Sequence, residues 1–204
     1  MARTAAGAAL TQRHRAVQLS LRAATVRDLV TLWGGVDPTN LAGTIGRFTA
    51  GGTALVRAQH QVSATAAGRY LGGFRLVELG TPGAAARLAA ALPADVVAGA
   101  LRGAGLAGII NARRAGFSPA AAARNGLVKV IGQAASLVFS GARDTLLATA
   151  SADPRSERWE RVTGPDPCDF CAMLAGRGAV FLSEQTADFE AHDHCACMAE
   201  PQFG

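Results

Sequence analysis

The residues best suited to chemistry are four cysteines and two histidines near the C-terminal end, Cys168, Cys171, His192, His194, Cys195 and Cys197. Cys168 and Cys171 are separated by two residues, a spacing that lets both sulfurs face one ion from a tight turn. After 20 further residues comes the second cluster, which holds more donors than one tetrahedral ion needs. The pattern predicts a structural Zn²⁺ site.

The sequence leaves the choice of four ligands open. Cys168 and Cys171 are the firmest candidates. In the second cluster, His192 and Cys195 are three residues apart, whereas Cys195 and Cys197 alternate as residues on one face of a strand do. His194 is either an alternative ligand or a hydrogen-bonding partner that orients one.

A small C-terminal unit would need such a metal to fold. A region of about 50 residues buries too little surface to be stable unaided. A structural zinc in a small module supplies roughly 10–16 kcal/mol of apparent binding free energy.

Three other uses of the cysteines are possible. Disulfides are disfavoured if the chain is made in a reducing cytoplasm. A thioredoxin-like Cys-x-x-Cys would require a βαβ unit and would leave the second cluster unexplained. A catalytic zinc would need an open coordination position and a general base, for which Glu190 and Asp193 are the nearby carboxylates.

Amphipathic spacing and turn residues predict the elements that carry this cluster. Ser118-Pro119 has the form of a helix N-cap followed by proline in the first turn. In the C-terminal tail (residues 151–204), a strand is expected at 178–182. Helices are expected at 9–33, at 39–48 with a resumption after Gly51-Gly52 to 77, in a short alanine-rich stretch after 83, at 92–115, and at 118–150 with a weak point at Asn125-Gly126.

Charge divides the chain near residue 150. Residues 1–150 hold 16 Arg/Lys and 5 Asp/Glu, a net charge of +11, and residues 151–204 hold 4 and 10, a net charge of −6. Opposite signs indicate two units with different surroundings. We therefore expect a mainly α protein, with a long alanine-rich helical region (1–150) and a small zinc-stapled α+β domain (151–204). The basic region would tolerate or bind a polyanion or an acidic protein face, although scattered arginines also suit a solvated helix surface.

Other features narrow the functional classes. His14 and His60 are isolated on predicted helices and are better explained as core or solvated residues than as ligands. Trp159 is expected to anchor the core of the tail. The sequence contains no nucleophile-elbow motif, no phosphate-loop motif and no dinucleotide-binding fingerprint that follows a strand. With no secretory signal and no long apolar run, we expect no membrane association and synthesis in the cytoplasm.

The tail also resembles a known family. Trp159-Glu160-Arg161-Val162, Pro167 to Leu174, Gly178 to Phe181, and Phe189 to Cys197 together resemble the MuF-like minor head proteins of tailed phages, especially those of actinobacteriophages. The family pattern has Cys-x2-Cys, a spacer and His-x2-Cys-x-Cys, so His192, Cys195 and Cys197 match its last three positions. His194 matches an addition in the actinophage-like variant. The resemblance covers about residues 157–201.

This resemblance implies a virion protein that acts in head assembly near the portal vertex. Its partners would be the portal protein and the major capsid or scaffold protein, with packaged DNA near the basic N-terminal region. Relatives are sometimes labelled capsid maturation proteases, but the sequence offers no Ser, His and acid combination. We therefore expect a non-enzymatic minor capsid protein. The alternatives are a capsid maturation protease or other assembly enzyme, and a nucleic-acid-binding zinc module. The tail's negative charge argues against DNA binding by the zinc domain itself.

Overall fold

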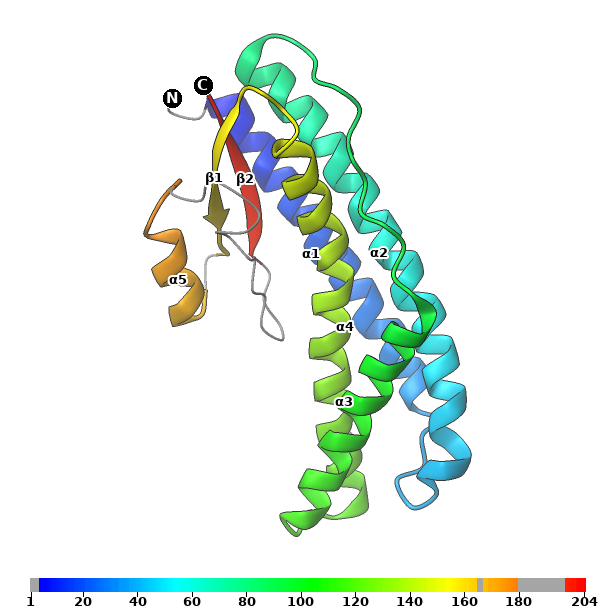
Figure 1. Ribbon diagram of the computed structural model, residues 1–204. Helices are drawn as coiled ribbons and strands as arrows, with labels where there is room; N and C mark the ends of the chain where they lie inside the picture. The colour runs from blue at the N-terminus through cyan, green and yellow to red at the C-terminus, as the bar shows by residue number, and fades with distance from the viewer. Residues whose placement is uncertain (1–3, 165–166, 180–196) are drawn as a thin grey trace.

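The computed structural model describes residues 4–164, 167–179 and 197–204. Within these ranges the chain is mainly helical, as the sequence predicts, with long helices side by side and a small sheet near one end (Figure 1). The elements are α1 (Ala5–Trp33), α2 (Leu41–Leu79), α3 (Ala94–Arg114), α4 (Pro119–Ala150), β1 (Ser156–Val162), α5 (Asp169–Ala175) and β2 (Met198–Phe203).

Side-chain caps explain where the long helices begin. Helix α1 starts a turn earlier than predicted because the Thr4 hydroxyl accepts a hydrogen bond from the Gly7 amide at 2.9 Å. Helix α4 begins where predicted, with the Ser118 hydroxyl accepting from the Ala121 amide at 3.3 Å. Pro119 then occupies the first turn, where its missing N–H is not needed.

Helix α2 is one continuous helix, so the predicted interruption at Gly51-Gly52 is wrong. Gly52 faces the core, where an added Cβ would lie 3.2 Å from Leu101 of α3 and 3.6 Å from Leu29 of α1. The absent side chain allows close packing of neighbouring helices at this position. Tertiary contacts therefore outweigh the low helix propensity of two adjacent glycines.

Helices α3 and α4 also pack closely at glycine positions, as α2 does at Gly52. An added Cβ on Gly108 would lie 2.7 Å from Gly126 Cα, and one on Gly126 would lie 2.9 Å from the Gly105 carbonyl oxygen. The predicted weak point at Asn125-Gly126 is therefore wrong, because α4 is continuous there. Gly126 instead lies where the backbones of α3 and α4 approach each other.

The connection between α2 and α3 is an extended strap (residues 81–93), so the predicted short alanine-rich helix is wrong. The strap runs along the bundle between the end of α2 and the start of α3 (Figure 1). Its Arg87 and Ala89 amides each donate a 2.9 Å hydrogen bond, to the hydroxyls of Thr149 and Thr145 on α4. An extended chain spans about 3.3 Å per residue against 1.5 Å in a helix, so the bundle geometry favours the extended form.

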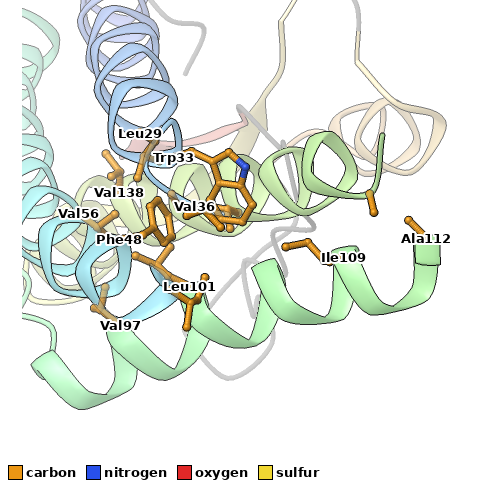
Figure 2. Packing of buried hydrophobic residues seen from close by; sticks show 14 of the residues in the cluster. Leu29, Trp33, Val36, Phe48, Val56, Val97, Leu101, Ile109, Ala112 and Val138 are labelled. Atoms are coloured by element: carbon orange, nitrogen blue, oxygen red, sulfur yellow. The ribbon is translucent and has the colours of Figure 1, made fainter. Parts of the chain in front are cut away.

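The larger hydrophobic core joins all four long helices (Figure 2). Trp33 at the end of α1 meets Phe48 of α2 edge to face, with ring centroids 4.8 Å apart. Leu101 of α3 and Val138 of α4 complete the contact between helices. Burial of these side chains provides the main force that holds the bundle together.

The tail packs on the bundle through a second core. Strands β1 and β2 pair antiparallel, with Trp159 opposite Pro201. Trp159 is buried, as predicted, and shares a cluster with Phe74 of α2, Leu146 of α4 and Phe203 of β2. This strand pair was not predicted from the sequence.

The strand predicted at 178–182 is not supported where it can be examined. Gly178 and Ala179 are not in a strand, and residues 180–182 lie outside the described residues.

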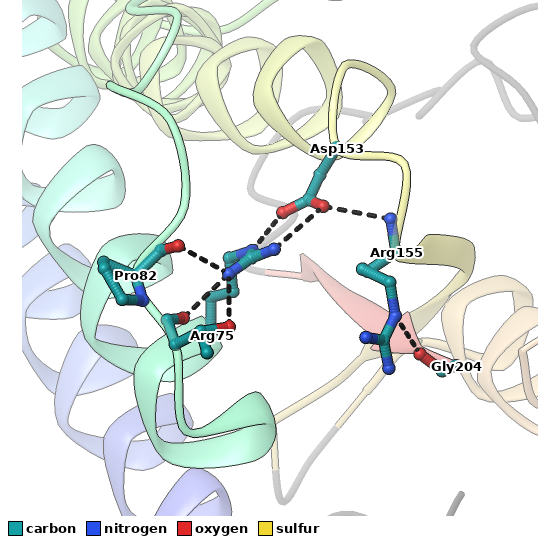
Figure 3. A network of polar contacts seen from close by, with 6 residues as sticks. Arg75, Pro82, Asp153, Arg155 and Gly204 are labelled. Atoms are coloured by element: carbon teal, nitrogen blue, oxygen red, sulfur yellow. Dashed lines mark hydrogen bonds and ion pairs between the residues drawn. The ribbon is translucent and has the colours of Figure 1, made fainter.

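A polar network ties the start of the tail to α2 (Figure 3). The Arg75 guanidinium forms an ion pair with Asp153 and donates to the Thr81 and Pro82 carbonyl oxygens at 2.7 and 2.8 Å. Burial by itself would raise the pKa of Asp153, but hydrogen bonds from Arg75 and from the Arg155 amide lower it overall. The network therefore fixes the beginning of the strap and the segment that follows the end of α4.

Candidate metal centre

The first predicted ligand pair lies at the start of α5. Cys168 is the N-cap residue of this helix, and its Sγ accepts a hydrogen bond from the Cys171 amide at 3.4 Å. Cys168 is exposed and Cys171 is buried. The two-residue spacing thus produces the expected tight turn, with an N–H group directed at the first sulfur.

An arginine side chain contacts each of the two buried cysteines that the structure describes. Arg161 of β1 is 4% exposed, and its Nη1 donates to the Cys171 Sγ at 3.8 Å. Arg143 of α4 is also buried, and its Nε donates to the Cys197 carbonyl oxygen at 3.2 Å. The N–H group directed at the Cys168 sulfur and the guanidinium beside the Cys171 sulfur each suit a thiolate ligand. The residues present therefore fit the chemistry of a zinc–thiolate site.

Cys197 connects this region to the bundle. It immediately precedes β2, is buried, and belongs to the same hydrophobic cluster as Cys171 and Trp159. Its carbonyl contact with Arg143 places it directly against α4. A metal bound through Cys197 would therefore be linked mechanically to the helical region.

The complete predicted ligand set is not tested by the described residues. His192, His194 and Cys195 lie outside them, as do Glu190 and Asp193. Within the described ranges, no three His, Cys, Asp or Glu side chains are arranged to hold a metal ion. The zinc site therefore stays a prediction.

A buried polar seam between the tail and the bundle was missed by the sequence analysis. Glu200 of β2 is fully buried, and its carboxylate accepts a hydrogen bond from the Thr11 hydroxyl of α1. The Thr11 hydroxyl also lies 2.8 Å from the Tyr70 hydroxyl of α2. Nothing in the local sequence marks Thr11 or Glu200, because each becomes a partner only when distant segments meet.

The two isolated histidines are core residues, which is one of the two predicted explanations. His14 stacks on Tyr70 with ring centroids 4.6 Å apart, and burial lowers its pKa to about 4. His60 is fully buried on α2, and burial lowers its pKa as well.

In the described parts of the chain, no helix is both long and apolar enough to cross a bilayer.

Comparison with known proteins identifies the family. The comparisons with curated proteins and with solved structures gave no match. The sequence model of the VG15 protein family matches residues 6–204, nearly the whole chain. The chain therefore belongs to the VG15 protein family, a family of viral (phage) proteins.

Proposed function

We propose that the protein is a MuF-like minor capsid protein of a tailed bacteriophage, which acts in head morphogenesis near the portal vertex and has no enzymatic activity. The observation that carries the proposal is the ordered series of landmarks from Trp159 to Cys197. Membership of a phage protein family supports it, because the landmarks then occur in the expected biological context.

The described tail suits a rigid docking element. Trp159, Cys171, Cys197 and Phe203 are buried in one cluster with side chains from α2 and α4. The tail is thereby oriented with respect to the helices, as a protein that bridges two head components requires.

We propose that the tail binds one structural Zn²⁺ through Cys168 and Cys171, together with two ligands from His192, Cys195 and Cys197. His194 is the alternative ligand or hydrogen-bonding partner. When bound, zinc would supply a tetrahedral cross-link between the start of α5 and the segment before β2. Arg161 lies beside the Cys171 sulfur and would balance part of the charge of a thiolate there.

The partners of this protein would be the portal protein and the major capsid or scaffold protein. Residues 1–150 carry a net charge of +11, which favours acidic protein faces and also tolerates nearby packaged DNA. The protein would be assembled into heads in the host cytoplasm and reside in the virion at the portal vertex or the capsid interior.

Quantitative mass spectrometry of purified virions and proheads tests the proposal. We expect a few intact copies of the chain per particle, counted against the portal protein. Absence from both particles would contradict it. Presence in proheads alone, with processed capsid protein in virions, would instead favour a transient assembly factor or the maturation protease.

Cross-linking in assembling heads provides the second test. A structural minor head protein should cross-link to portal, capsid or scaffold protein. Cross-links to none of these would refute the proposed location.

A further inference from the structure

Between Asp95 near the start of α3 and Asp144 near the end of α4, the α3–α4 hairpin carries charges of one sign. Between Asp95 and Asp144 the sequence contains no acidic residue. Five cationic side chains in this interval are exposed, Arg102, Arg113, Arg114, Arg124 and Lys129. Exposed charges of one sign on one hairpin raise the local concentration of negatively charged partners.

A shallow groove of about 420 Å³ lies between the two helices of this hairpin. Small apolar residues of α3 and the Phe117 ring make up its apolar part, and three amide side chains together with Lys129 make up its polar part. None of the lining residues is acidic. They are Ala104, Ala107, Gly108, Asn111, Ala112, Phe117, Asn125, Lys129 and Gln133.

Phe117 is the largest apolar side chain in the groove and is 48% exposed. Its backbone is held in the α3–α4 turn, where its amide donates to the Ala112 carbonyl oxygen at 3.0 Å and its carbonyl accepts from Arg113 Nη1 at 2.8 Å. Ile110 and Val128, on the same hairpin, are also more than two-fifths exposed. Aromatic side chains are common anchors of protein–protein interfaces, and the Phe117 ring is half-exposed at the edge of an apolar groove.

We propose that this groove binds an amphipathic helix of a partner protein, whose apolar stripe packs on Phe117 and the alanines and whose carboxylate pairs with Lys129. The groove extends from Ala104 to Ala112 along α3, about 12 Å or two helical turns, which suits the apolar stripe of a short helix. The absence of acidic residues between Asp95 and Asp144, and from the groove lining, favours a helix that carries Asp or Glu.

Nucleic acid fits this groove less well. A phosphate backbone requires cations repeated along its path, whereas the groove contains one cation and an apolar floor. An apolar centre with cations outside it corresponds to the usual composition of a protein–protein interface.

The test places a photo-activated phenylalanine analogue at position 117 of the full chain, expressed during phage assembly. Val62, which is 49% exposed on α2, is the matched control position. We expect position 117 to form an adduct with one protein segment rich in Asp or Glu, and position 62 not to form that adduct. The segment is identified by mass spectrometry of the cross-linked peptide.

A charge reversal tests the ion pair. Lys129→Glu should lower the yield of this adduct by about tenfold or more, because it places like charges opposite each other. Arg47→Glu makes the same charge change at an exposed position of α2 and should change the yield by less than about twofold. Both positions are exposed, and circular dichroism will verify that both variants keep their helix content.

The use of assembling heads rests on the proposed function. The identity of the cross-linked partner distinguishes failure of the groove proposal from failure of that function. An adduct with a protein that is not part of the head supports the groove and refutes the proposed function. An adduct with portal or capsid protein that is insensitive to Lys129→Glu overturns the charge recognition but not the proposed function. An adduct with DNA, or no adduct at position 117, overturns the groove as a protein-binding site.

Discussion

The Thr11 hydroxyl donates a hydrogen bond to the Glu200 carboxylate, across 189 positions of the chain. The contact joins the first helix to the last strand, and both side chains are buried. Glu200 is therefore held by the helices even though it lies beside the cysteine-rich segment. A buried carboxylate must have partners, so this contact makes the tail's position depend on α1.

Removal of the Thr11 hydroxyl should destabilise the protein. Thr11→Val keeps the shape of the side chain but deprives Glu200 and Tyr70 of a shared partner, at a cost of about 1–3 kcal/mol in the free energy of unfolding. Urea unfolding followed by circular dichroism measures the effect. Thr31→Val is the control, since Thr31 is exposed and bonds only its own helix, at the Arg27 carbonyl. Equal stability of the two variants would show that the buried contact contributes nothing.

Stability should fall in mild acid because of His14. Its pKa is about 4 in the folded protein, below the usual value of about 6.5, and its Nε2 has no hydrogen-bond partner among the described residues. Above pH 6.5 the ring is neutral in both states. Between pH 6.5 and 4 the unfolded chain binds a proton that the folded chain does not, so stability is lost as the pH falls.

The variant His14→Phe isolates this contribution, because it keeps a ring against Tyr70 and cannot titrate. Between pH 6.5 and 4.5 the wild type should lose about 2 kcal/mol more than the variant, as measured by urea unfolding at each pH. His60 titrates in both proteins and cancels in the comparison. Parallel pH profiles would rule out His14 as a source of acid sensitivity.

Two glycines on α3 should respond oppositely to the same substitution. Gly108→Ala places a Cβ 2.7 Å from the Gly126 Cα, a backbone atom, and should destabilise by about 1–3 kcal/mol. Gly103→Ala meets nothing within 4 Å and should stabilise by about 0.5–1 kcal/mol through better helix propensity. Chemical denaturation of both variants provides the comparison. If Gly108→Ala were also stabilising, the close crossing of α3 and α4 would be incorrect.

Metal analysis separates two roles of Cys168. We expect one zinc per chain in the purified protein, and a large loss of zinc in Cys168→Ser and Cys171→Ser. Serine is a good N-cap residue, so Cys168→Ser keeps the cap of α5 and removes only the thiolate ligand. Asp169→Asn, at the neighbouring exposed position, should retain one zinc. Full zinc content in both cysteine variants would refute the proposed ligand pair.

Removal of zinc should also loosen the tail. A strong chelator is expected to increase amide hydrogen exchange in β2 more than in α3, because β2, unlike α3, directly follows a proposed ligand, Cys197. Unchanged exchange in β2 after complete metal removal would show that zinc does not support this strand.

The sequence by itself determined the features that depend on local chemistry. Ser118-Pro119 starts a helix because the cap and the fixed proline torsion act within one turn. Trp33 ends α1 as predicted, since glycines and a proline follow it. The Cys-x2-Cys spacing likewise sufficed to predict a tight turn with both cysteines in it, because four consecutive residues form it.

Only the tertiary structure decided the features that depend on distant partners. The strap is extended because threonine hydroxyls of α4 bind its amides, and α2 stays continuous because Gly52 faces Leu101 and Leu29. In the sequence Glu200 is one of ten acidic residues in 151–204, and only the fold places Thr11 beside it. Such contacts have no local signature, because the free energy that selects them comes from surfaces that are brought together only when the chain folds.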